Sequence, residues 1–126
     1  MNIDVTGSPV EALGELPDMD LDPDLLHVAR AMVAHRSGEL VYTRRWLHSR
    51  PEISRAEHET TAALRERLMV QGLKPRVLSV GTGLVCDIGH EGPLVALRAD
   101  IDALAMDEAN DVPYRSIHDG ACHACG

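Results

Sequence analysis

The chain has 126 residues, a formal net charge of -8 and 44% apolar residues, with only 2% aromatic residues and no phenylalanine. This size and composition indicate one globular domain with an aliphatic core. So few rings disfavour a nucleic-acid surface that works by base stacking, and no apolar run reaches the roughly 18 residues of a membrane span.

The acidity is concentrated at the N-terminus, where residues 1–24 hold seven acidic residues and no basic one. Residues 1–21 also contain scattered glycines and prolines without sustained hydrophobic periodicity, so we predict a flexible acidic leader over this range. The start lacks the basic and apolar regions of a secretory signal, which indicates a cytoplasmic protein. Residues 22–126 are then expected to form the structured part.

The first helix is expected to begin at Asp22-Pro23, because Asp is favoured as an N-cap and Pro at the first helical position. Apolar residues at helical spacing extend it to about His35, and Ser37-Gly38 then interrupts or bends it. A second helix is predicted from Glu39 to His48, since the following Arg50-Pro51 disfavours helical angles. Its inward-facing residues are expected to be Leu40, Val41 and Leu47.

The third helix has the clearest start signal. Ser54-Arg55-Ala56-Glu57 fits a capping box, in which the Ser and Glu side chains each accept from an amide of the first turn. The helix is predicted to run to about Gln71, and Gly72 supplies its C-terminal stop.

Three short runs rich in Val, Leu and Ile follow, separated by turns that contain glycine: Arg76–Val80, Leu84–Ile88 and Leu94–Ala99. This pattern predicts two consecutive β-hairpins. The last run is continuously apolar, which indicates an inner strand covered on both faces. The order of elements therefore predicts an α/β fold of N-terminal helices followed by β-hairpins, incomplete as a free-standing layer structure.

Two acidic residues follow the predicted inner strand. Asp100 falls at its carboxyl end, where open α/β sheets place their ligand sites, and Asp102 follows two residues later. An equally good interpretation is that one of the two caps a short helix that begins at Ala103.

The chain ends in a Cys122-x-x-Cys125 pair. A redox pair of the thioredoxin type needs a helix after the motif, and covalent haem attachment needs a histidine where Gly126 stands. A zinc site is a further possibility, although four ligands within eight residues match none of the usual spacings. It would use His118, Cys122, His123 and Cys125. A frayed tail is the structural alternative.

Three blocks of the sequence together resemble a known family, that of the metallo-aminoacylases and carboxypeptidases. The branch is that of hippurate hydrolases, bacterial N-acyl-L-amino acid amidohydrolases and plant auxin-conjugate hydrolases. The blocks are Arg44–Glu52 with Glu57 and Thr60, then Ala96–Leu104, then Tyr114, Ser116, Gly120 and His123–Gly126. The resemblance covers about residues 39–126. It departs from the family at Ala105, normally Pro, and at Cys122, normally Met, and neither position is a family ligand.

The resemblance implies part of the mixed-sheet catalytic domain of a dinuclear metallohydrolase. Such enzymes use two divalent cations, zinc or manganese, to hydrolyse the amide bond of N-acyl amino acids or small amide conjugates. Cys125 matches a metal ligand. Asp100 matches an aspartate near the metal centre, with a role that is either to support a ligand or structural.

The family motif continues with His-Asp where this sequence ends, and its general base and remaining ligands match no residue of the chain. We therefore expect an N-terminal fragment, without the lid domain, that is inactive alone and does not retain the metals. Two alternatives are the N-terminal piece of a split enzyme with a separate C-terminal chain, and a small metal-binding or regulatory module. No nucleic-acid or membrane partner is expected.

Overall fold

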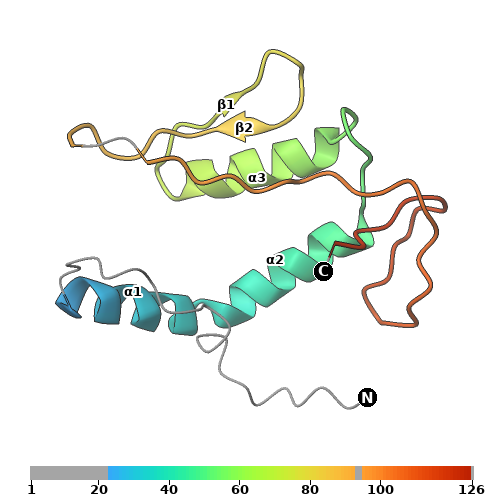
Figure 1. Cartoon of the computed structure of the whole chain (residues 1–126), viewed down its shortest axis with the longest axis horizontal. Coiled ribbons are helices and arrows are strands. Elements are labelled where there is room, and N and C mark those ends of the chain that lie inside the picture. Colours follow the sequence, from blue (N-terminus) through green and yellow to red (C-terminus); the bar gives the residue numbers. More distant parts are fainter. Residues whose placement is uncertain (1–22, 93–94, 126) are drawn as a thin grey trace. The chain divides into compact units, whose positions relative to one another are not determined.

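The computed structural model describes residues 23–92 and 95–125 (Figure 1). Three helices come first, followed by two short strands: α1 Pro23–His35, α2 Ser37–Ser49, α3 His58–Val70, β1 Arg76–Val77 and β2 Leu84–Val85. The chain divides into two compact units, residues 1–37 and residues 38–126. The predicted α/β fold, with helices first and a β-hairpin after them, is confirmed. The predicted acidic leader over residues 1–21 lies outside the described residues.

Helix α1 forms the described part of the first unit. It begins at Pro23 and ends at His35 as predicted, while the expected cap Asp22 lies outside the described residues. The interruption falls at Arg36, one residue before the predicted Ser37-Gly38. No residue of α1 is buried. Its large apolar side chains are more than half exposed: Leu25, Val28, Met32 and Val33.

Helix α2 opens the second unit and starts two residues earlier than predicted. The expectation that Leu40 and Val41 face inward is wrong, since they are 53% and 45% exposed. The reason is that the described part of this unit packs on the opposite end of the helix. There Leu47 is half-buried and His48 is buried.

The predicted capping box of α3 is wrong. The helix begins at His58, and its N-cap residue Glu57 makes no side-chain cap hydrogen bond. A tight turn explains the difference: Arg55 has φ 70° and the Ala56 N–H donates to the Ile53 carbonyl, so Ser54 lies before the helix.

The cap of α3 comes instead from Glu52, which the sequence reasoning did not single out for this role. Its carboxylate accepts from the N–H groups of Glu59 at 2.9 Å and Thr60 at 2.7 Å. Burial alone raises the pKa of Glu52, but the hydrogen bonds, led by that of Thr60, outweigh it and lower the pKa. An ionised carboxylate at a helix N-terminus is also favoured by the helix dipole.

The C-terminal end of α3 confirms the predicted stop at Gly72. This glycine has φ 78°, and its N–H donates to the Met69 carbonyl at 2.9 Å. The next amide, of Leu73, donates to the Leu68 carbonyl at 3.1 Å. The two bonds form a Schellman motif, which satisfies the last carbonyls of the helix.

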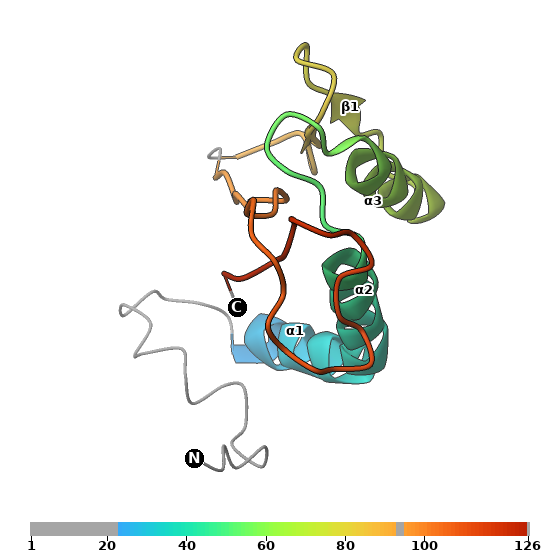
Figure 2. The same cartoon turned by 90° about the vertical axis from the view of Figure 1, so that its right-hand side faces the viewer.

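The first predicted hairpin is present but short. Strands β1 and β2 pair antiparallel, with Arg76 opposite Val85 and Val77 opposite Leu84. The hairpin lies against α3 (Figures 1 and 2), where the Gly83 N–H donates to Thr61 Oγ1 at 2.9 Å. Thr61, which accepts this bond, is buried, and so is Thr82, the neighbour of Gly83 in the hairpin turn.

The second predicted hairpin is wrong. Residues 95–99 form no strand, and Val95 and Leu97 are 81% and 99% exposed, whereas Leu94 lies outside the described residues. The physical reason is the lack of a strand within the described residues that pairs with this segment, so neither face is covered.

Pairing occurs further along the chain, where single bridges join three segments. Ala103 bridges Ile53 in parallel, and Leu104 bridges Cys122 antiparallel. The Ala103 N–H donates to the Glu52 carbonyl at 2.8 Å, while Leu104 and Cys122 exchange two hydrogen bonds of 2.9 and 3.0 Å. The buried apolar residues of the described part gather here: Ala103, Ala121 and Cys122.

Two glycine substitutions test the assigned helix boundaries. Gly72→Ala is expected to lower the free energy of unfolding by about 1 kcal/mol, because its positive φ disfavours any Cβ. Gly38→Ala is expected to raise it by up to about 1 kcal/mol, since Gly38 lies inside α2 and an added Cβ meets no atom within 4 Å. Denaturant unfolding followed by circular dichroism measures both. Changes of the same sign would contradict the boundaries.

Candidate functional site

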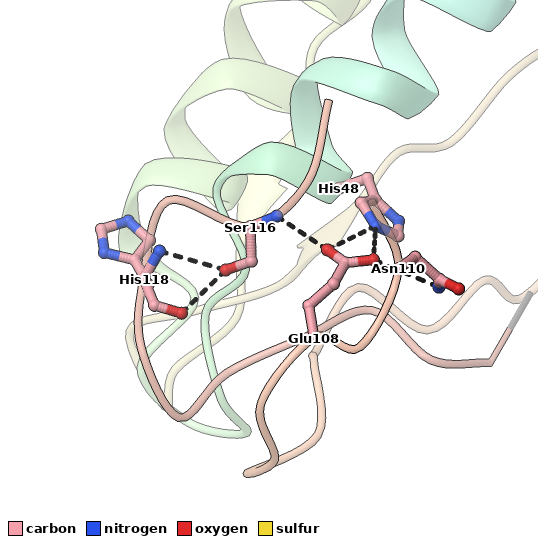
Figure 3. A network of polar contacts seen from close by, with 5 residues as sticks. All are labelled: His48, Glu108, Asn110, Ser116 and His118. Atoms are coloured by element: carbon pink, nitrogen blue, oxygen red, sulfur yellow. Dashed lines mark hydrogen bonds and ion pairs between the residues drawn. The ribbon is translucent and has the colours of Figure 1, made fainter. Parts of the chain in front are cut away.

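A buried pair joins α2 to the irregular C-terminal half of the chain (Figure 3). His48, in the last turn of α2, places Nε2 3.0 Å from both carboxylate oxygens of Glu108, sixty residues later. The two side chains are 10% and 2% exposed. A hydrogen-bonded pair this well shielded is far less screened by solvent than a surface ion pair.

Glu108 has further donors. The Ser116 N–H donates to Oε2 at 2.7 Å, and the Asn110 side-chain amide donates to Oε1 at 3.3 Å. The Ser116 bond and then the His48 bond lower the pKa of Glu108, outweighing the effect of burial. The carboxylate is therefore ionised at neutral pH and accepts hydrogen bonds from three residues, of which His48 is distant in the sequence.

Aromatic rings surround the His48 side of the pair. Tyr114 meets the His48 ring edge to face at 5.5 Å between centroids, and the Arg45 guanidinium lies 4.9 Å from the Tyr114 centroid. The ring of His123 lies on another side of His48, tilted, at 6.4 Å. Residues of α2 and of the C-terminal part of the chain therefore converge at the end of α2.

The loop between Glu108 and Cys122 is held by its own polar contacts. The Ile117 N–H donates to the Ser49 carbonyl at 3.0 Å, which fixes the loop to the end of α2. Ser116 Oγ donates to the His118 carbonyl and accepts from the His118 N–H (Figure 3). Gly120 has φ 75° and its N–H donates to Asp107 at 2.7 Å.

A cavity of about 270 Å³ opens beside the pair. Its wall includes two residues of α2 and several of the C-terminal segment, among them Arg44, His48, Glu108, Tyr114, Cys122 and His123. A larger hollow of about 610 Å³ lies on α3 and the hairpin. Its lining mixes apolar residues with polar and charged ones and includes neither His48 nor Glu108: His58, Thr61, Ala62, Arg65, Glu66, Met69, Val70, Val77 and Gly81.

The comparisons with known proteins bear on this arrangement. No family model matches the chain. An N-acetyl-L-cysteine deacetylase of Bacillus subtilis is 47% identical over 90 residues, which cover 70% of this chain and 22% of that protein. A solved dinuclear metal binding peptidase of the M20 family, also from Bacillus subtilis, matches with a TM-score of 0.66 at 39% identity, over 69% of this chain and 25% of its own. This chain belongs to the metallo-aminoacylase family.

A second solved structure, of a protein from methicillin-resistant Staphylococcus aureus, agrees with this assignment. Its TM-score is 0.70 at 31% identity, and the match covers 76% of this chain and 26% of that one. The family predicted from three sequence blocks is thus confirmed. The chain spans about a quarter of the length of these relatives.

The donors of the C-terminal motif differ in their surroundings. Burial raises the pKa of the Cys122 thiol, and the negative charge of Glu108 raises it further. Cys125 is exposed and His123 is half-buried, and the His123 Nε2 atom is shielded from solvent without a hydrogen-bond partner in the described part. Cysteine thiolate and neutral imidazole are typical zinc donors.

These donors do not converge, however. Within residues 23–92 and 95–125, no three His, Cys, Asp or Glu side chains come together around one point. The zinc arrangement considered from the sequence is therefore not formed there, and all three cysteines are free. The described residues therefore do not by themselves form a site that fits a pair of metal ions.

Asp100 lies outside the cavity. Its carboxylate pairs with Arg98 at 2.7 Å, and the two side chains are 68% and 86% exposed. Burial and then the charge of His48 lower the pKa of His123, and the opposing effect of the negative charge of Asp102 is smaller. The alternative that one of these aspartates caps a helix at Ala103 is wrong, since Ala103 bridges Ile53 instead.

Sequence reasoning missed the central residue of the site, Glu108. His48 stands in the first family block, but sixty residues separate it from Glu108. No local pattern links the two. A faint signal does exist for Glu52, since an acidic residue directly after Arg50-Pro51 is well placed to cap a following helix.

The pH dependence of stability tests the state of Glu108. Because its folded pKa lies below the ordinary 4.5, Glu108 stabilises the fold fully above that pH, and the contribution is lost as pH falls through the folded pKa. Glu108→Gln should therefore destabilise the chain at neutral pH and flatten the acid side of the profile. Thermal melts between about pH 3 and pH 7 measure this.

The matched control is Asp87→Asn, which removes an exposed carboxylate paired with Arg76. It should leave the pH profile close to that of the wild type. Indistinguishable profiles for Glu108→Gln and Asp87→Asn would contradict the account.

Proposed function

We propose that the protein to which this segment belongs hydrolyses the amide bond of N-acyl amino acids or small amide conjugates. The observation that carries the proposal is the 47% identity with a protein named N-acetyl-L-cysteine deacetylase. Removal of the acetyl group from such a compound is hydrolysis of an N-acyl amino acid. The fold match to a dinuclear metal binding peptidase supports the same class of reaction.

In this proposal Cys125 supplies one ligand to a pair of divalent metal ions, zinc or manganese. Its exposed thiol, next to the cavity-lining Ala124, supports the role. Asp100 is assigned a supporting role near the centre on the resemblance of its sequence block alone, since its carboxylate here pairs with Arg98 outside the cavity. The remaining ligands come from residues outside the described part.

We further propose that residues 1–126 are inactive and retain no metal by themselves, because the general base and other ligands of the family match no residue of the printed sequence. Further polypeptide completes the enzyme, either as part of a longer chain or as a separate C-terminal chain. The exposure of Ile88, Val95 and Leu97 supports this. Covering each such side chain stabilises a fold by roughly 1.5–3 kcal/mol.

A cytoplasmic location belongs to the same proposal. No helix in the described ranges is long and apolar enough to cross a membrane.

Two cysteine substitutions in the complete enzyme test the assignment. Cys125→Ala is expected to lower kcat/KM for N-acetyl-L-cysteine by about 100-fold or more and to reduce the bound metal, because a ligand is lost. Cys122→Met restores the residue usual in the family and should leave both nearly unchanged. Release of acetate and elemental analysis provide the measurements. Equal effects of the two substitutions would contradict the role of Cys125.

The isolated 126-residue chain provides a second arm. It should release no acetate above background with added Zn²⁺ or Mn²⁺, and Cys125→Ala should behave identically. Metal-dependent hydrolysis by this chain that disappears in Cys125→Ala would refute the proposed inactivity. Tight one-to-one zinc binding without hydrolysis would favour a metal-binding module instead.

A further inference from the structure

The segment from residue 104 to residue 125, called here the motif segment, contains no helix and no strand of two or more residues. A segment of this kind has no regular ladder to hold its backbone, so its place depends on a few specific contacts. Its two ends are joined to each other by the Leu104–Cys122 bridge, and Ala103, the residue before it, bridges Ile53. Contacts to α2 come from Glu108, Tyr114, Ile117 and His123.

Among these contacts the pair of His48 and Glu108 is the most shielded from solvent, with side chains 10% and 2% exposed. Both Glu108 oxygens face His48 Nε2, and Oε2 also accepts from the Ser116 N–H. The pair thus fixes two points of the motif segment, residues 108 and 116, to one helix. Removal of either partner leaves a polar group buried without its hydrogen bond, which is costly.

The far end of the segment depends on the same helix position. His48 lies against the ring of His123, two residues before Cys125, and Cys122 is buried at 5% exposure opposite Leu104. We propose that His48 and Glu108 are positioning residues that lock the motif segment onto the end of α2 and thereby set the place of the Cys125 thiol. This inference rests on the proposed function for its metal-binding part only.

The reactivity of the Cys122 thiol reports whether the motif segment is held against the end of α2. Cys86→Ser and Cys125→Ser leave Cys122 as the single thiol of the chain, because the sequence has three cysteines. The rate of reaction with a disulfide reagent is measured as a function of pH. Its plateau above the thiol pKa measures access to the sulfur, and its midpoint measures the electrostatic surroundings.

His48→Ala should raise the plateau rate on the order of 100-fold, because the motif segment then detaches locally from α2 and exposes the Cys122 sulfur. His48→Gln keeps an amide that can donate to Glu108 and should restore most of the protection. Glu108→Gln should raise the plateau and also shift the midpoint to lower pH, because the charge that raises the Cys122 pKa is gone. Glu108→Gln keeps the experiment decisive if His48→Ala fails to fold.

Gly72→Ala is the matched control, because it weakens the end of α3 without touching the pair. It should raise the plateau by no more than about tenfold, in proportion to the loss of global stability. A His48→Ala plateau that equals that of Gly72→Ala, or that of the parent, would overturn the proposal. Failure of His48→Gln to restore protection would count against it equally.

The metal-binding part has a readout of its own. It uses the complete enzyme with all cysteines present, in which Co²⁺ bound to a thiolate gives a sulfur-to-metal absorption band. His48→Ala should weaken the Co²⁺ affinity about 10- to 100-fold, and His48→Gln should restore it. If the pair protects Cys122 but the unsubstituted enzyme shows no sulfur-to-metal band, the metal role of Cys125 is refuted, while the role of the pair in holding the motif segment stands. If the unsubstituted enzyme shows the band but the pair does not protect Cys122, only the role of the pair in holding the motif segment is refuted.

Discussion

The Glu108 carboxylate is the point at which α2 and the irregular C-terminal half of the chain meet. It is 2% exposed and accepts hydrogen bonds from the His48 ring, the Ser116 backbone and the Asn110 side chain. Because no regular ladder of hydrogen bonds holds this half of the described chain, its folding depends on contacts of this kind. The arrangement of Tyr114, Cys122 and His123 around the end of α2 follows from it.

Glu52 has a comparable role at the start of α3. Its carboxylate caps α3, and its backbone carbonyl accepts from Ala103, so one residue connects a helix start to the segment that leads to the site. The buried apolar side chains of the described part are small: Ala103, Ala121 and Cys122. Hydrophobic burial scales with area, so polar contacts carry an unusual share of the organisation here.

What the sequence could predict was local. The start of α1 at Pro23 and the stop of α3 at Gly72 follow from the preferences of single residues, and three short blocks identified the family. The capping box at Ser54 failed because a competing turn at Arg55 moved the helix start to His58. The buried strand at residues 94–99 failed because an apolar run indicates burial only where something covers it. The Glu108 pair could not be found at all, since its partner lies sixty residues away.

Amide hydrogen exchange of the 126-residue chain tests most directly the claim that Glu108 organises the site. The account predicts slow exchange at Ser116 and Cys122, whose N–H groups donate to Glu108 and Leu104, and fast exchange at the exposed Leu97. In Glu108→Gln the protection of Ser116 and Cys122 should be lost, while Leu73, bonded at the end of α3, keeps its own. Protection of Ser116 and Cys122 that survives the substitution, or that is no greater than that of Leu97 in the wild type, would contradict the account.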